Sequence, residues 1–326
     1  MWSRFCRHRT AYWSLAAFLG LLSAAVLLSP LSLRWFNVQD LSGAVRGAPT
    51  STPITRYAVY SGQLGEGSGG SMLSSIAPTV YGAAGWMGYD ALGRSLLFRV
   101  LFGWLVSLGI GLGAAFMSLT IGVAWGAVAG LAGGRVDAVM MRVVDVLYGL
   151  PYVLFVILLM VVLEEPLSGW FGAGKSVANF VILFLAIGAV SWLTMARLVR
   201  GQVLSLRAQP FVEAAYASGV GTVRVLWRHL LPNLAGPVVA CATLVIPQAI
   251  LQESFLSFLG IGVQAPMPSL GLLAADGVES VNTFVGFWWL ITFPCGILVL
   301  TLLALNFIGD GLRDALDPKS SASVMI

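Results

Sequence analysis

One stretch of the sequence has the residue types and spacing of a phosphate-binding loop. The run is Gly169-Trp-Phe-Gly-Ala-Gly174-Lys175-Ser176. Such a loop holds nucleotide phosphates with backbone N–H groups and a lysine, between a strand and a helix of a soluble α/β domain with a further acidic metal ligand. Here the run lies between two apolar segments. We interpret it as a coincidence and expect any ATP to be hydrolysed by another chain.

A second stretch, from Gln209 to Asn233, is the best candidate for contact with a partner protein. Pro210 suits a first helical turn, and Glu213-Ala-Ala-Tyr-Ala-Ser218 favours a helix that Gly219-Val-Gly221 then breaks. Thr222 can cap a second helix through its side-chain oxygen. The pattern predicts two short helices joined by a turn, which need something to pack against; the alternative is a structured linker.

Four polar residues interrupt the apolar segments: Gln248, Gln252, Glu253 and Asn306. Ionisable groups inside a membrane are functional candidates by default. The four residues either line a polar translocation path or bond between helices. For Glu253, pairing with an arginine at the membrane interface is an equal alternative.

The composition identifies the kind of element that must position these residues. The chain has 326 residues, of which 58% are hydrophobic and only 10% are charged, against about 25% charged in soluble domains. A helical membrane domain follows. The net charge of +4 comes without a run of basic residues, so a nucleic-acid partner has little support. Three cysteines and two histidines are too scattered for a disulfide framework or a metal site.

A transmembrane helix needs about 20 mostly apolar residues, and the charged residues divide the chain into six candidates. These lie at about 12–33, from about 96, and at about 146–163, 177–196, 234–258 and 286–308. The predicted fold class is therefore an all-α membrane protein with six transmembrane helices. The first candidate could also be a cleaved signal peptide, but its length and the lack of a clear cleavage site favour an anchor.

Positive residues favour the cytoplasmic side of a membrane. With the N-terminus inside, the inner segments hold twelve Lys and Arg residues and the outer segments six. We therefore predict that both termini are cytoplasmic. The predicted regions are a tail and first helix (1–33), an extracytoplasmic Gly/Ser/Thr-rich segment (34–90), a core of five helices (91–310) containing the cytoplasmic loop 209–232, and a cytoplasmic tail (311–326).

The loop 209–232 resembles the EAA loop of ATP-binding-cassette importer permeases. The resemblance rests on Glu213-Ala214-Ala215, Gly219 and His229-Leu230-Leu231-Pro232, with His229 where the family usually has Ile. It implies a type I importer permease fold and coupling helices that dock into a groove on an ATPase subunit. The residues it assigns to this coupling are Glu213, Ala214, Ala215, Gly219, His229, Leu231 and Pro232.

Further stretches are similar to dipeptide, oligopeptide and nickel permeases. They lie at 90–103, 133–151 and 253–269, while the tail from Asn306 to Pro318 points to the C-type subunit. Tyr89, Ser95 and Phe98 depart from the family pattern, and residues 37–85 match nothing recognisable. The resemblance implies a second homologous permease, two ABC ATPase subunits that bind ATP and Mg, an extracytoplasmic substrate-binding protein, and no cofactor in this chain.

Peptides are the substrate that this resemblance favours, with nickel, glutathione or another small solute as alternatives. A stand-alone secondary transporter is the alternative of another class, although no internal repeat of the kind found in such proteins is visible. A membrane enzyme has no support from paired carboxylates or a nucleophile–base pair. Two features remain open: Gly122, Gly126, Gly130 and Gly134 could serve helix packing or helix sliding, and Arg142 could pair with Asp145.

Overall fold

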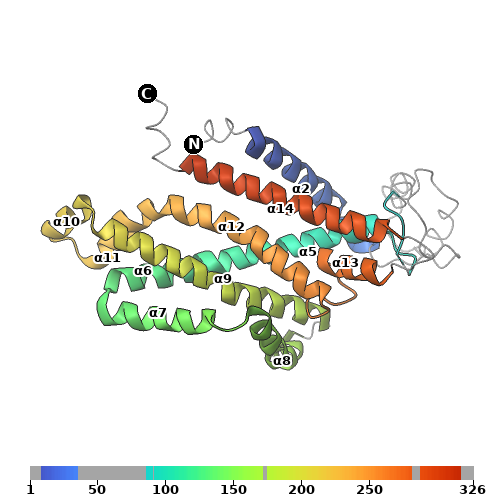
Figure 1. The fold of residues 1–326 in the computed structure, drawn as a ribbon, viewed down its shortest axis with the longest axis horizontal. Coiled ribbons are helices and arrows are strands. Elements are labelled where there is room, and N and C mark those ends of the chain that lie inside the picture. The colour runs from blue at the N-terminus through green and yellow to red at the C-terminus, as the bar shows by residue number, and fades with distance from the viewer. Residues whose placement is uncertain (1–8, 36–85, 91, 172–174, 281–286, 317–326) are drawn as a thin grey trace. The chain divides into compact units, whose positions relative to one another are not determined.

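The computed structural model describes residues 9–35, 86–90, 92–171, 175–280 and 287–316. Within these ranges the chain is helical apart from turns and an isolated antiparallel bridge between Tyr89 and Ser95. The helices in Figure 1 are α2 (Arg9–Trp35), α5 (Leu96–Met117), α6 (Val123–Ala132), α7 (Gly134–Tyr148), α8 (Tyr152–Phe171), α9 (Lys175–Arg207), α10 (Pro210–Ala217), α11 (Thr222–Val225), α12 (Leu231–Phe258), α13 (Leu270–Glu279) and α14 (Trp289–Leu316). Nearly all of the predicted extracytoplasmic segment 34–90 lies outside the described residues.

Five helical stretches of the described chain are long and apolar enough to cross a membrane. They are Thr10–Ser29, Leu96–Ala132, Asn179–Arg207, Thr222–Phe258 and Trp289–Leu316. A sixth crossing is possible if α7 and the first part of α8 count as one broken span. The predicted all-α membrane fold is confirmed.

The third predicted span, 146–163, is not one continuous helix. Helix α7 ends at Tyr148 and α8 begins at Tyr152, and the two helices are bent by 89° at the break. The residues between them end in Pro151, which lacks an N–H donor and disfavours a helical conformation in the residue before it. An unbroken apolar run therefore contains a sharp change of direction.

Helix continues through much of the predicted polar segment between the fourth and fifth spans. Helix α9 runs on to Arg207, and the helix that starts at Thr222 continues through a π-helical turn, Leu226–Leu230, into α12. Thr222 is not a capping residue, because Gly221 occupies the N-cap position without a side-chain hydrogen bond. Pro232 has no N–H, so in a regular α-helix the carbonyl of Arg228, four residues earlier, would have no donor. Arg228 is one of the residues of the π-helical turn.

The described chain divides into two compact units. The first comprises Met1–Phe18, Leu108–Glu253 and Thr301–Ile326. In this unit α9 packs against α6, α7 and α8 (Figure 1). The second comprises Leu19–Ser107 and Ser254–Leu300 and includes α13, which the sequence analysis did not predict. The side chain of Ser269 caps α13 by accepting a hydrogen bond from the amide of Leu272 at 3.2 Å.

Three of the four regularly spaced glycines bring two helices of the first unit into close contact. A methyl group on Gly122 would lie 2.6 Å from Cβ of Met195, and one on Gly130 would lie 2.9 Å from Cβ of Val203. A methyl group on Gly126 would overlap the carbonyl oxygen of Ala196. The glycines therefore allow α6 and α9 to approach at the backbone, as small residues do in membrane helix pairs. The fourth, Gly134, would meet nothing within 4 Å.

Replacing Gly126 with alanine is expected to destabilise the first unit. The added methyl group meets backbone atoms of α9 that cannot move independently, and overpacking of this kind costs about 1–3 kcal/mol. The matched control is Gly109→Ala on α5, where an added methyl group meets nothing within 4 Å and alanine favours the helix by up to about 1 kcal/mol. Thermal unfolding of the detergent-solubilised chain measures the difference, and equal midpoints would contradict the packing role.

Candidate coupling segment and polar cavity

Helix α10 packs against neighbouring helices through its apolar face. It begins at Pro210, in the first-turn position that the sequence predicted. Val212 and Ala215 are buried in a cluster that also contains Val225 and Leu230, together with residues of α9. The two helices of the candidate coupling segment, residues 209–232, therefore pack partly against α9. One face of α10 remains available to a partner.

The turn after α10 depends on a glycine in the left-handed region of backbone conformation. Gly219 has a φ of +78°, which residues with a Cβ rarely adopt. Its N–H donates to the carbonyl of Tyr216 at 2.9 Å, and the next amide, of Val220, donates to the carbonyl of Ala215 at 3.1 Å. This hydrogen-bonded end of the helix is the kind that glycine terminates. The predicted turn at Gly219 is confirmed.

The predicted coupling residues do not all lie on the surface of the segment. Glu213, Ala214, Gly219 and Pro232 are exposed, His229 and Leu231 are partly buried, and Ala215 is buried in the cluster described above. The amide side chain of Asn233 donates to the carbonyl of His229 at 2.6 Å. The exposed residues of the motif are therefore an acidic residue, a small apolar residue, the turn glycine and a proline.

The segment also exposes large apolar side chains that the sequence analysis missed. Val223 and Trp227 are each 69% exposed, and Phe211 and Tyr216 are exposed by about 40%. Exposed apolar groups of this size are typical of surfaces that another protein or the membrane covers. Trp227 in particular is a residue type that anchors interfaces. No signal in a single sequence distinguishes such residues from core residues.

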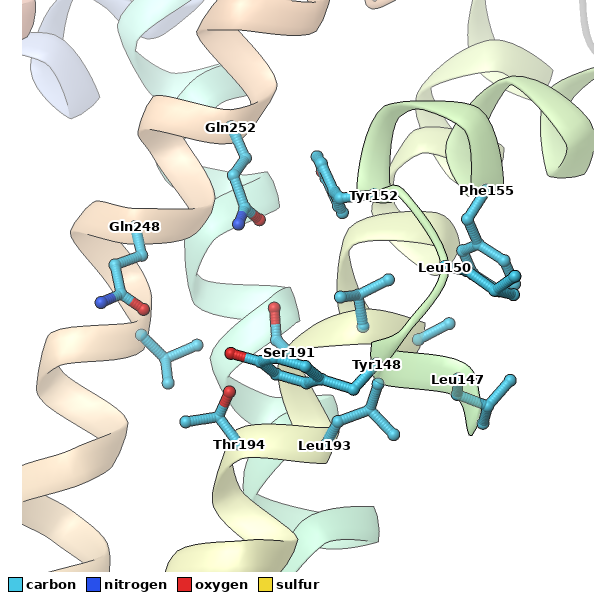
Figure 2. A pocket seen from close by; sticks show the side chains of 13 residues that line it. Leu147, Tyr148, Leu150, Tyr152, Phe155, Ser191, Leu193, Thr194, Gln248 and Gln252 are labelled. Atoms are coloured by element: carbon cyan, nitrogen blue, oxygen red, sulfur yellow. The ribbon is translucent and has the colours of Figure 1, made fainter. Parts of the chain in front are cut away.

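A polar cavity of about 480 Å³ lies in the first unit, between the α7–α8 junction, α9 and α12. Figure 2 shows Gln248 and Gln252 extending into it from α12, with Tyr152 on the other side. Its other polar lining residues are Tyr148, Ser191 and Thr194. The two glutamines predicted for a translocation path therefore share one cavity. Glu253 is buried beside Gln252, and neither Glu253 nor the exposed Asn306 lines this cavity.

Ion pairs between α7 and α9 hold the helix that forms one edge of this cavity. Arg200 donates to both carboxylate oxygens of Asp137, at 2.5 and 2.7 Å, a two-bond geometry that adds directional specificity. Arg197 lies 4.2 Å from the ring centre of Tyr148 and donates to Asp145 at 2.9 Å. The ion-pair partner of Asp145 in the described chain is thus Arg197 of α9, and not Arg142, which the sequence left open as a partner.

The second unit contains a buried charge cluster built on Asp90. This carboxylate accepts hydrogen bonds from Arg94 Nε at 2.7 Å and from Arg99 Nη1 at 2.6 Å, as well as from the amides of Leu92 and Arg94. Arg99 also lies 3.3 Å from Asp276 on α13. The cluster joins the start of α5 to α13. It explains why the Asp90–Arg99 stretch carries charges next to an apolar helix.

The family follows from the match between the sequence and known proteins. Residues 122–322 match the model described as the binding-protein-dependent transport system inner membrane component. The chain belongs to this family. It is therefore a multi-pass inner membrane protein and a transport component, and the resemblance to ATP-binding-cassette importer permeases is confirmed.

Several relatives agree with this membership. The chain is 46% identical to an oligopeptide transport system permease protein of Haemophilus influenzae over 247 residues, which is 76% of this chain and 74% of that protein. It is 44% identical to the dipeptide transport system permease protein of Bacillus subtilis over 72% of this chain and 68% of that protein. An oligopeptide permease protein of Mycobacterium tuberculosis is 36% identical over 97% of this chain and 93% of that protein.

The inward-facing methionine ABC transporter MetNI has the same fold. The match has a TM-score of 0.55 and 19% identity, and it covers 68% of this chain and 98% of that chain.

Neither of the other chemistries considered from the sequence has a site in the described chain. The phosphate-loop pattern starts inside α8, so helix rather than strand precedes it, and residues 172–174 lie outside the described ranges. Among the described residues there is no group of three or more His, Cys, Asp or Glu side chains that could hold a metal ion.

Proposed function

We propose that this chain is the permease subunit of an ATP-driven importer of dipeptides and oligopeptides. The observation that carries the proposal is the 44–48% identity, over about three quarters of the chain, to permease proteins named for oligopeptide and dipeptide transport. Nickel and glutathione remain the alternatives, and a stand-alone secondary transporter is the alternative of another class.

In this proposal the chain does no chemistry and works within an assembly. A second, homologous permease completes the pathway, and an extracytoplasmic binding protein delivers the peptide. Two ABC ATPase subunits hold ATP and Mg and bind the coupling segments on the cytoplasmic side, where both termini also lie. ATP and peptide shift the assembly between its conformations only through their different affinities for the two states.

The coupling segment has properties that suit a protein partner. The exposed Glu213 carboxylate can accept a charge-assisted hydrogen bond from a basic group, and the exposed Trp227 and Val223 of the same segment offer apolar contact area. Because Val212 and Ala215 fix α10 to the membrane helices, a displacement of α10 by the ATPase would be transmitted to α9 and α12.

Reconstitution of the complete transporter tests the proposal. The chain is co-expressed with its companion permease and ATPase subunits, purified, and placed in proteoliposomes with the binding protein. We expect a labelled tripeptide to accumulate only with ATP, and unlabelled dipeptides and oligopeptides to compete. ATP-driven accumulation of nickel or glutathione without peptide uptake would contradict the proposed substrate. Gradient-driven uptake by the chain alone would contradict the importer assembly.

A further inference from the structure

The polar cavity of the first unit is lined by hydrogen-bonding groups without formal charge. Its polar side chains are two phenols, two aliphatic hydroxyls and two amides, and its other lining residues are apolar. The nearest buried charge is Glu253, which is not a lining residue but acts electrostatically on Tyr152. The cavity volume of about 480 Å³ lies within the range of cavities that bind small molecules. The lining therefore suits a ligand with several hydrogen-bonding groups.

One of these groups has an unused hydrogen-bonding capacity. The hydroxyl oxygen of Tyr152 is buried and has no hydrogen-bond partner within the described part of the chain. Buried polar groups in proteins are nearly always paired, so an orphaned hydroxyl in a cavity calls for an explanation. A ligand that supplies a donor or an acceptor at this position would satisfy it.

The group opposite Tyr152 is an amide. Gln252 extends into the cavity from α12 towards the same space as Tyr152, and Gln248 lies one helical turn away (Figure 2). A glutamine side chain offers a carbonyl acceptor and an N–H₂ donor, and a tyrosine offers a hydroxyl that can donate or accept. A peptide bond carries one N–H donor and one C=O acceptor. The two side chains together thus match both halves of a peptide group.

We propose that this cavity binds main-chain peptide groups of the transported substrate, with Gln252 accepting from the peptide N–H and Tyr152 donating to the peptide carbonyl. The inference rests on the proposed function and specifies what part of the substrate the site recognises. Since every peptide has these groups, the site binds the substrate regardless of its side chains.

A double-mutant cycle between protein and substrate tests the inference. The complete transporter in proteoliposomes takes up either trialanine or an analogue in which an ester replaces the central peptide bond. The ester has no N–H and a weaker carbonyl acceptor, but nearly the same shape. The quantity measured is the ratio of the two initial uptake rates at low substrate concentration. Because the binding protein is unchanged, its own preference for the amide cancels between variants.

Tyr152→Phe and Gln252→Met each remove one hydrogen-bonding partner with little change in volume. We expect each variant to lower the amide-to-ester ratio by about three- to tenfold, which is the usual contribution of one neutral hydrogen bond. Tyr12→Phe and Gln202→Met make the same chemical changes at exposed positions of α2 and α9 and should leave the ratio unchanged. Basal ATPase activity verifies that each variant is assembled.

Ratios for Tyr152→Phe and Gln252→Met within twofold of the wild-type ratio would overturn the inference while leaving the proposed function intact. A wild-type complex that accumulates neither trialanine nor its ester with ATP would overturn the proposed function itself. The two failures therefore give different results in the same assay.

Discussion

Replacing Gly219 with proline is expected to abolish ATP-driven uptake while the chain remains in the membrane. Proline fixes φ near −65° and cannot adopt the +78° found at this position. It also removes the N–H that donates to the carbonyl of Tyr216 at 2.9 Å. A penalty of about 3 kcal/mol or more lowers the equilibrium constant for forming this turn by about a hundredfold. Co-purification of the ATPase subunit and uptake by proteoliposomes measure the loss.

The matched control lies two residues further on. Gly221 has a φ of −65°, which suits proline, and a side chain there would meet nothing within 4 Å. Gly221→Pro should therefore retain most of the uptake. Glu213→Arg provides an independent test, because it reverses the charge of an exposed residue without disturbing the buried face of α10. Wild-type coupling in both Gly219→Pro and Glu213→Arg would show that the segment does not transmit ATPase movements.

The membrane helices could be predicted because the apolar segments are bounded by charged residues. The spans that begin at residues 96 and 289 start close to the predicted residues 96 and 286 for this reason. The bend between α7 and α8 could not be predicted in the same way, since apolar composition shows that a segment suits lipid but does not give the direction of its helix axis. Pro151 was the available signal. Helix α13 was missed because ten residues are too few for a span.

In the candidate site, too, some residues could be identified from local sequence patterns, whereas others are brought together only by the fold. Gln248 and Gln252 were found because they are polar residues in an apolar segment, and they line one cavity because residues four apart share a helix face. Tyr152 joins them only because of the bend at residues 149–151. The partner of Asp145 is Arg197, which lies 52 residues away, so no helical spacing rule could identify it. The predicted coupling motif gave the turn at Gly219 but not the exposure of Trp227.

Replacing Asp90 with asparagine is expected to destabilise the second unit strongly. Asparagine keeps the size of the side chain and an oxygen that can accept from the amides of Leu92 and Arg94, but it removes the negative charge. The Arg99 side chain, which is only 3% exposed, then keeps an ion pair only with Asp276 among the described residues, at 3.3 Å and with the Asp276 side chain 44% exposed. Removing one partner of a buried ion pair costs about 3–5 kcal/mol, because the other charge stays buried without compensation.

Thermal unfolding in detergent, followed by tryptophan fluorescence, should detect the loss as a midpoint lowered by roughly 5 °C or more. Asp145→Asn is the control, because it makes the same change in an Asp–Arg pair whose side chains are 57% and 39% exposed. An exposed pair contributes about 0–1 kcal/mol, so this midpoint should hardly move. If Asp90→Asn and Asp145→Asn unfolded at the same temperature, the Asp90–Arg99 pair could not be what fastens the start of α5 to α13.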